Sequence, residues 1–397
     1  MRTLILPDAG FLAREQALIA RLEIGLADEG VRVLHAVPRS SGALEVGSSL
    51  YSTPVTYADE GLPLTLGFRA SSLARELERN AMSEGGRAGA RAALAGAARV
   101  IDVVHCFGVD SMKFGLTLAR QCGSAALIEL WTREHIGLAA KLLRRSGLGG
   151  RSLCVAPDQN LLSVAQTQLG QKRVELAPWG VHVTESPRRV RKEKDPISIM
   201  FVLSGERAGR TALGALQARA ALEGIAQFAR GGREVLAFVE ASAAEGFPLT
   251  KWAAELGLAG AITIIEGLES RRDLLVQADV LLVPQSLGEH RTLLLDALSA
   301  QMGVLMLADP FVEAADEAHG VRILPDSKPV AWSEALARWA NDEQDNAARA
   351  QRGRAYVMQR RPSFAHPVAV VRAYARIADA NNELRGVVPA ITQGGGA

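Results

Sequence analysis

The stretch QADVLLVPQSLGEHRTLLLDALSAQMGVLMLAD, residues 277–309, decides the fold class. An apolar run at 278–283 is followed by a polar loop at 284–289, by leucine and alanine at helical spacing at 290–302, and by a second apolar run at 303–307. The order strand, loop, helix, strand predicts a βαβ unit, in which a right-handed crossover joins two parallel strands. Ligands of such sheets bind beyond the carboxyl ends of the strands, so the polar loop is the first place to look for a site.

Strand and helix alternate in the same way along most of the chain, which predicts an α/β fold with doubly wound parallel sheets. In the first half, strands are expected at residues 3–6, 31–37, 100–106, 125–130, 152–156 and 173–177, and helices at 11–29, 71–82, 87–98, 111–121, 134–145 and 160–169. In the second half, strands are expected at 197–203, 234–239, 261–266, 278–283, 303–307 and 321–324, and helices at 211–229, 248–256, 271–277, 290–302, 330–341 and 343–359. Residues 38–67, rich in Ser, Gly and Pro, are expected to be irregular.

A chain of 397 residues is longer than one hydrophobic core supports, so two domains are expected. The charged run at 184–196, with prolines near both ends, has the composition of a linker. We expect a first domain at 1–186 and a second at 187–362, facing each other across a cleft that is a favoured place for a ligand. The last helix, within 363–385, is expected to pack back on the first domain, and residues 386–397 to form a disordered tail.

Composition and charge are those of a globular protein in a reducing compartment. Hydrophobic residues make up 48% of the chain, and the net charge of +2 is too small to predict nucleic acid as a partner. The first apolar run ends at Pro7 and Asp8, too early for a signal peptide, and no window approaches the roughly 18 apolar residues of a membrane span. Cys106, Cys122 and Cys154 are isolated, which favours small core residues over a disulfide or metal site. We therefore expect a cytoplasmic protein.

Several segments resemble the retaining GT-B-type glycosyltransferases of family four, also called glycosyltransferase group 1. ADVLLVPQS at 278–286 followed by LLLDALSAQMGVLMLAD at 293–309 is similar to the donor-domain signature of that family. DVVHCFG at 102–108, VELAPWGVHV at 174–183 and ISIMFVLSGERAGR at 197–210 are similar to further family segments in the same order. The resemblance covers essentially the whole chain.

The resemblance implies a GT-B architecture, in which two Rossmann-like domains face each other across a cleft. The first domain then takes the acceptor and the second the nucleotide-sugar donor. A hexose is moved from that donor to a carbohydrate or lipid acceptor with retention of configuration, without a metal or a further cofactor, as in polysaccharide or glycolipid synthesis. A second hypothesis stays open: a family member that kept the fold, lost the chemistry and acts as a binding or scaffold protein in a polysaccharide or glycolipid assembly.

The resemblance also implies roles for the loop and helix after the strand at 278–283. The two family glutamates stand eight positions apart, so if Asp296 takes the place of the second, the first falls on Gly288 and Glu289 lies one position late. Glu289 would hold sugar hydroxyls and Asp296 the ribose, while the amides of Thr292 and Leu293 at the helix start would bind the donor phosphate.

Ser286, His290 and Arg291 belong to the same loop and are assigned to donor binding with it. The alternative for the loop is a capping turn with ordinary surface charge, and the alternative for Asp296 is an acid on a helix face.

A second loop, SGERAGR at 204–210, follows the first strand of the second half. The arginine and lysine of the family fall on Glu206 and Thr211, but Arg207 and Arg210 stand beside them. With Gly205, these arginines are implied to meet the donor diphosphate and to neutralise the leaving group. They are equally consistent with solvated loop residues. Neither this loop nor PDAGFLA near the amino terminus has the G-x-G-x-x-G spacing of a nicotinamide-dependent oxidoreductase.

Four first-domain residues are candidates for the acceptor side: Gly10 at the first strand-helix turn, His105 in the strand at 100–106, Trp131 and His135. His105 has a competing interpretation as a hydrogen-bonded core histidine. Trp131 either stacks on an acceptor sugar or fills the wall of the cleft, and Gly10 is either a ligand-facing turn or only a turn.

The helix at 134–145 carries Lys141, Arg144 and Arg145 beside leucines. This pattern fits a helix that rests on an anionic membrane surface, which would place the protein at the inner face of the membrane. An ordinary surface helix explains the pattern equally well.

Overall fold

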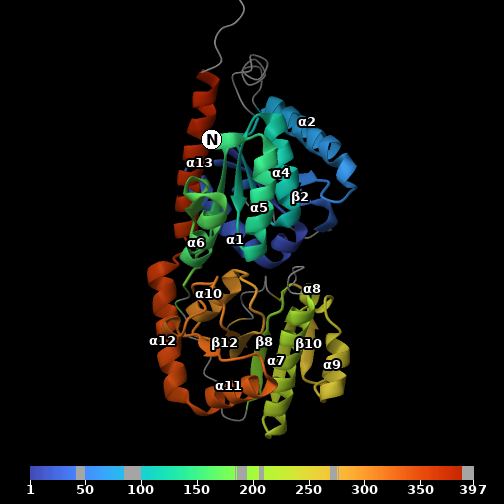
Figure 1. The fold of residues 1–397 in the computed structure, drawn as a ribbon, viewed down its shortest axis with the longest axis vertical. Helices are drawn as coiled ribbons and strands as arrows, with labels where there is room; N and C mark the ends of the chain where they lie inside the picture. Colours follow the sequence, from blue (N-terminus) through green and yellow to red (C-terminus); the bar gives the residue numbers. More distant parts are fainter. Residues whose placement is uncertain are drawn as a thin grey trace, which may run out of the picture.

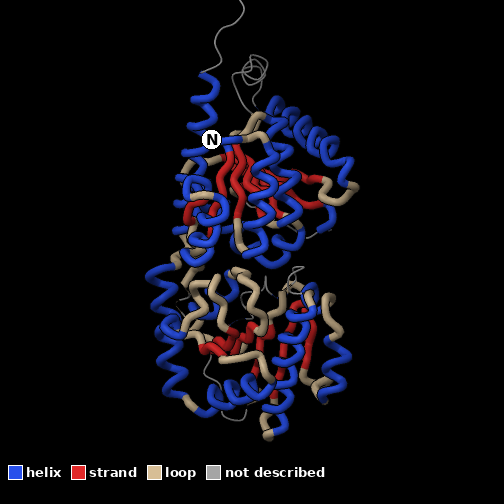
Figure 2. The backbone as a smooth tube through the Cα atoms, in the orientation of Figure 1, coloured by secondary structure: helices blue, strands red, loops and turns tan. Residues whose placement is uncertain are grey.

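The computed structural model describes residues 1–41, 50–84, 100–183, 185, 195–204, 210–268, 275 and 277–386. These residues form two α/β parts, one above the other, and each is built around its own parallel sheet with helices packed against it (Figures 1 and 2). The expected helices at 87–98 and 271–277, the linker at 184–196 and the tail lie wholly or mostly outside the described residues. In the described part of the chain, no helix is both long and apolar enough to cross a membrane.

The first sheet has seven parallel strands in the order β3-β2-β1-β4-β5-β6-β7. Its strands are β1 (Arg2–Pro7), β2 (Arg32–Pro38), β3 (Ser52–Tyr57), β4 (Val103–Phe107), β5 (Ala125–Glu129), β6 (Ser152–Ala156) and β7 (Val174–Leu176). Its helices are α1 (Ala9–Asp28), α2 (Leu66–Glu84), α4 (Val109–Cys122), α5 (Arg133–Ser146), α6 (Gln159–Leu169) and α13 (Ala365–Gly386). The central strands are buried on both faces, as helices on both sides require.

The second sheet has six parallel strands in the order β10-β9-β8-β11-β12-β13. Its strands are β8 (Ile197–Phe201), β9 (Val235–Glu240), β10 (Ile262–Ile265), β11 (Val280–Val283), β12 (Gly303–Leu307) and β13 (Arg322–Leu324). Its helices are α7 (Ala212–Arg230), α8 (Ala241–Ala244), α9 (Leu249–Leu256), α10 (Thr292–Ser299), α11 (Pro329–Asn341) and α12 (Glu343–Arg360). The βαβ unit expected at 277–309 is β11, α10 and β12, and its two strands pair in parallel.

Two expectations about local structure are wrong. The stretch at 38–67 is not wholly irregular, because it contains β3, whose alternating Val55 and Tyr57 are buried. Pro54 hid this strand, but a proline is tolerated here because β3 lies at the edge of the sheet and pairs only with β2. The helix expected at 290–302 is shorter, since α10 covers only Thr292–Ser299 and the amide of His290 donates instead to the Trp131 carbonyl of the first domain.

The chain passes between the domains at two neighbouring places. After β7, Val181 donates its amide to the Arg361 carbonyl at 3.0 Å and forms an isolated parallel bridge with Pro362. Gly180 fits there because a Cβ would lie 2.1 Å from the Pro362 carbonyl oxygen. α12, which ends just before this point, lies along the second domain, and α13, which begins just after it and is red in Figure 1, lies along the first.

The carboxyl edges of the two sheets face each other and are in contact. Thr132, just after β5, forms an antiparallel bridge with Glu289, in the loop after β11, and the Arg133 amide donates to the Gly288 carbonyl at 3.2 Å. The start of α6, which follows β6, also touches the loop after β12, since Asn160 Nδ2 donates to the Pro310 carbonyl at 3.2 Å. The loops in which ligands of such sheets bind therefore lie at one common interface.

Candidate functional site

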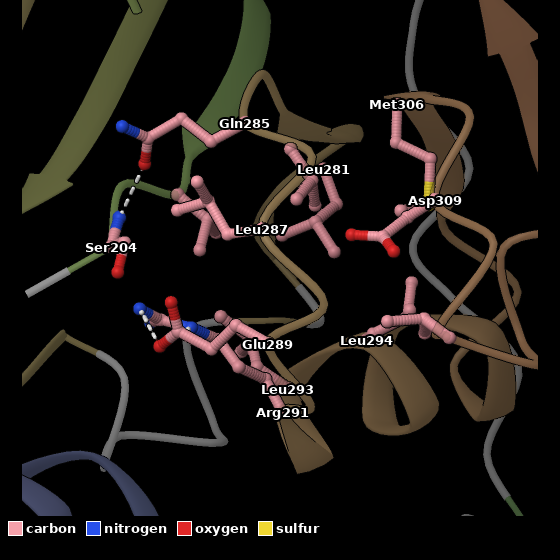
Figure 3. Close-up of a pocket in the computed structure, with 13 residues that line it drawn as sticks. Ser204, Leu281, Gln285, Leu287, Glu289, Arg291, Leu293, Leu294, Met306 and Asp309 are labelled. Carbon is pink, nitrogen blue, oxygen red and sulfur yellow. Dashed lines mark hydrogen bonds and ion pairs between the residues drawn. The ribbon is translucent and has the colours of Figure 1, made fainter. Parts of the chain in front are cut away.

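A small cavity lies at the carboxyl edge of the second sheet, beside the ends of β8 and β11 (Figure 3). The strand order reverses between these two strands, and that is where open α/β sheets bind ligands. The cavity has a volume of about 30 Å³, room for one or two waters and far below the roughly 300–1,000 Å³ of ligand pockets. Its lining is mainly apolar, with polar groups from Ser204, Gln285, Glu289, Arg291 and Asp309.

Glu289 is the glutamate of this cavity, and it is paired. Arg291 Nη2 lies 2.8 Å from Glu289 Oε1, and the same guanidinium donates to the Leu203 carbonyl at 3.0 Å. Burial by itself raises the pKa of the Glu289 carboxyl, but the charges of Arg291 and Arg14 and hydrogen bonds from Ser204 and Arg291 outweigh burial and lower the pKa. Glu289 is therefore a carboxylate held between cationic groups of both domains.

The backbone at Gly288 explains why the acid stands one position later than the resemblance implies. Gly288 has a φ of +66°, in the left-handed region that favours glycine. A Cβ there would lie 3.0 Å from Phe311 Cβ and 3.1 Å from Arg133 Cβ. A glutamate at 288 would be strained and crowded, and the carboxylate reaches the cavity from Glu289 instead.

The amino-terminal end of α10 holds a carboxylate from the first domain. Glu15, in α1, accepts a hydrogen bond from the Thr292 amide at 3.0 Å and another from the Thr292 hydroxyl. Both residues are buried. The amide that we expected to bind a donor phosphate thus binds a protein carboxylate in this structure, while Leu293 contributes its side chain to the cavity lining.

His290 belongs to the contact between the domains. Its amide donates to the Trp131 carbonyl at 2.8 Å, and its Nε2 lies 2.6 Å from Asp158 Oδ2. Asp158 is the N-cap of α6 and also accepts from the Glu313 amide at 2.8 Å. Burial raises the pKa of Asp158, but His290 and the amides of Leu161 and Glu313 outweigh burial and lower the pKa to about 2. His290 thereby contacts the first domain in this structure, and its expected role in donor binding stays a prediction.

The contact of Asp158 with the second domain is expected to weaken in acid. A carboxyl whose pKa is lower in the folded state stabilises that state above its unfolded pKa, 3.8 here, and loses this contribution as the pH falls toward its folded pKa of about 2. Between about pH 5 and about pH 2, the free energy of unfolding of wild type, measured with urea, should therefore fall by about 2 kcal/mol more than that of Asp158→Asn. A difference between the two proteins that stays constant over this range would contradict the assignment.

His105 lies in the core and not at the cleft, so its expected acceptor-side role is corrected. Its Nε2 lies 3.0 Å from Glu129 Oε2 and its Nδ1 2.8 Å from the Tyr374 hydroxyl, all fully buried. Glu129 also accepts from Trp179 Nε1 at 2.6 Å and lies 3.1 Å from His366 Nε2. Burial raises the pKa of Glu129, but the two histidines outweigh burial and lower the pKa to about 2. This network ties α13 to the first sheet.

Trp131 and His135 form the inner wall of the interface. The Trp131 ring is 1% exposed and packs on Phe11 and His135, with the Arg14 guanidinium 5.2 Å from its centre, so no face is open for a sugar. Burial, together with the charge of Arg14, lowers the pKa of His135 to about 3 and keeps the ring neutral. Gly10 is exposed in the first turn of α1.

An open groove of about 560 Å³ runs beside the cavity, between the domains. Its lining comes from both domains and consists of Arg133, Glu134, Gly137, Gln168, Thr211, Ser286, Leu287 and Phe311. Ser286 thus lies in a space large enough for a ligand, although its hydroxyl donates to the Ala308 carbonyl at 2.7 Å.

Of the remaining donor-side candidates, the structure describes Arg210 and Asp296, and neither lines the cavity or the groove. Arg210 is exposed beside Thr211, the N-cap of α7, and its side chain lies against Gly246. Asp296 lies one turn along α10 and is not among the described residues that line the cavity or the groove. Gly205 and Arg207 lie outside the described residues.

Sequence reasoning missed the residues that close the interface. Glu15 and Arg14 lie in an amphipathic helix, where charged residues usually face solvent. Arg361 donates to the Pro157 carbonyl at 2.6 Å and to Glu313 Oε2 at 2.9 Å, and nothing in its local sequence marks it. Only Asp158 carried a signal, since an aspartate directly before a helix is a common N-cap.

Comparison with known proteins identifies the architecture. No protein-family model and no curated protein matches the chain. Sucrose-phosphate synthase from Thermosynechococcus elongatus is similar, with a TM-score of 0.70 and 13% identity over 96% of this chain and 100% of that one. HepE from Anabaena, in complex with UDP and glucose, has a TM-score of 0.65 and 11% identity over 94% and 99%. A glycosyltransferase from Rickettsia africae has a TM-score of 0.62 and 11% identity over 95% and 98%. At such identity the likeness shows the fold alone: the chain has the GT-B architecture, and its family within that fold is not fixed.

Proposed function

We propose that the chain is a nucleotide-sugar-dependent glycosyltransferase whose donor binds to the second domain at the carboxyl ends of β8 and β11. One observation carries the proposal: Glu289, Arg291 and the start of α10 come together at the point where the strand order reverses, on the face that meets the first domain. The proposal gains support from HepE, a protein of the same architecture that was solved with UDP and glucose.

The proposed roles follow from charge. Glu289 accepts hydrogen bonds from sugar hydroxyls, and its ionised state suits it to do so. Arg291 and the positive end of α10 face the phosphate that leaves with the nucleotide. The open groove at Ser286 and Thr211 offers the route by which the donor approaches.

Retention of configuration, independence from a metal, and a carbohydrate or lipid acceptor are finer parts of the proposal and rest on the family resemblance. Roles for Arg207, Arg210, Gly205 and Asp296 in holding the nucleotide also rest on it. Peripheral membrane contact through Lys141, Arg144 and Arg145 is a further part, and these three side chains are exposed on α5.

Calorimetric titration with UDP, GDP and their glucose and mannose conjugates tests the proposal. We expect one nucleotide series to bind. Glu289→Gln should lower the affinity for the sugar conjugate by roughly 10- to 100-fold and change the affinity for the bare nucleotide less. Glu334→Gln, an exposed exchange on α11, serves as the matched control. Absence of binding across the whole panel at millimolar concentration would refute the proposed donor site.

A second candidate is a GT-B protein that binds a partner or ligand without turnover. The observation that favours it is the satisfied state of the site: Glu289 is already paired with Arg291, and the Thr292 amide with Glu15. Product analysis separates the two candidates, because donor binding without sugar transfer or donor hydrolysis, over a panel of saccharide and lipid acceptors, supports the non-catalytic protein.

A further inference from the structure

Glu15 is an acidic residue of the first domain whose carboxylate lies against the second. α1 departs from helical geometry at this residue, with φ −115° and ψ 26°. The side chain reaches the first residue of α10 and accepts hydrogen bonds from both the amide and the hydroxyl of Thr292. Glu15 belongs to the first domain and Thr292 to the second, so this contact requires the two domains to lie against each other as they do in this structure.

The groups that bind Glu15 are those that bind phosphates at helix ends. A helix amino terminus offers amides and a positive partial charge, which favour any anion with accepting oxygens. A carboxylate and a phosphate therefore make the same kind of contact with the Thr292 amide and hydroxyl. Both cannot occupy that amide at once.

The closed interface also leaves polar groups without partners. Trp131 Nε1 and His135 Nδ1 are buried and have no hydrogen-bond partner among the described residues. Both side chains stand next to Arg14, which precedes Glu15 in α1. Buried polar atoms without partners are uncommon in native structures, and a polar ligand that entered this part of the interface would supply the missing partners.

We propose that Glu15 is an internal competitor for the donor phosphate, and that its contact with Thr292 holds the protein in a closed state from which the donor is excluded. The inference rests on the proposed function, because it names the regulation of the same site. Donor binding then requires α1 to withdraw from α10. The apparent affinity is reduced by the fraction of molecules in which this contact is made.

Removing the carboxylate should raise donor affinity. Calorimetry with UDP and with inorganic pyrophosphate is run on wild type, Glu15→Gln and Glu15→Ala. We expect both ligands to bind the alanine variant roughly 10- to 100-fold more tightly than wild type, with glutamine intermediate because its amide oxygen still accepts one hydrogen bond. Glu29→Gln, an exposed exchange directly after α1, should leave both affinities unchanged.

A second measurement does not depend on nucleotide. Hydrogen exchange at the first turn of α10 and the radius of gyration from X-ray scattering are compared for the same proteins without ligand. We expect faster exchange and a larger radius in Glu15→Ala than in wild type, because one of the contacts that hold the domains together, the one at the start of α10, is lost. Unchanged exchange and radius would overturn the closing role of Glu15.

The outcomes separate the inference from the function on which it rests. Binding of UDP by wild type and Glu15→Ala with equal affinity overturns the competition and leaves the proposed donor site standing. Absence of binding to either protein, with faster exchange in Glu15→Ala, overturns the competition together with the donor site. Tighter binding in Glu15→Ala with faster exchange supports both.

Discussion

Replacing Glu129 with alanine is expected to lower the free energy of unfolding by about 3–5 kcal/mol. Glu129 receives hydrogen bonds from Trp179 and lies within hydrogen-bond distance of His105 and His366, all buried. Removing the carboxylate leaves these groups without an acceptor in a region that water does not reach. Urea unfolding followed by circular dichroism measures the loss.

The matched control for this substitution is Glu334→Ala. Glu334 pairs with Arg338 on the surface of α11, where both side chains are more than half exposed, so the change should stay within about 0.5 kcal/mol. Because the network holds α13 against the first sheet, Glu129→Ala should also increase protease cleavage within α13. A loss below about 1 kcal/mol would show that the network contributes little to stability.

Replacing Arg291 with methionine is expected to lower the free energy of unfolding by a similar amount, about 3–5 kcal/mol, for a different reason. The Glu289 carboxylate is only 8% exposed, and methionine removes the guanidinium that lies 2.8 Å from it. The remaining charge is then buried without its main partner, and the pKa of Glu289 should rise. Thermal and urea unfolding at neutral pH measure the effect.

The double variant Glu289→Leu with Arg291→Met identifies the cause. When both partners are replaced, no buried charge is left unpaired, so the double variant should be more stable than Arg291→Met alone by at least about 1 kcal/mol. If the stability losses of the two single variants add up to that of the double variant, the two side chains act independently. The pairing seen in Figure 3 would then contribute nothing to stability.

The architecture was predictable because it rests on local patterns. Apolar runs and helical spacing repeat along the chain, and the structure confirms an α/β fold with two parallel sheets. The strand at Ser52–Tyr57 was missed because Pro54 and polar neighbours obscured an alternation that only an edge position permits. The positions at which the two domains begin and end stay a prediction.

The candidate site was less predictable, because its contacts come from distant parts of the chain. Glu15 has the local sequence of a solvated helix residue, and its burial depends on α10 in the other domain. His105 becomes a core residue through Tyr374, which belongs to the last helix. Glu289 was identified from its loop, and its partner Arg291 lies two positions later in the same loop, but its contact with Thr132 and the nearby charge of Arg14 depend on how the domains meet.

The paired crossings at Val181 and Pro362 decide how such a molecule can move. Two backbone segments that are hydrogen-bonded side by side are suited to act as a hinge. Such a hinge permits rotation of one domain against the other and resists sliding or separation. In a hinge rotation, the displacement of an atom grows with its distance from the hinge. Groups near the hinge, such as Arg361 with its hydrogen bond to the Pro157 carbonyl, would then move least. The parts of the facing surfaces that lie furthest from the hinge would move most.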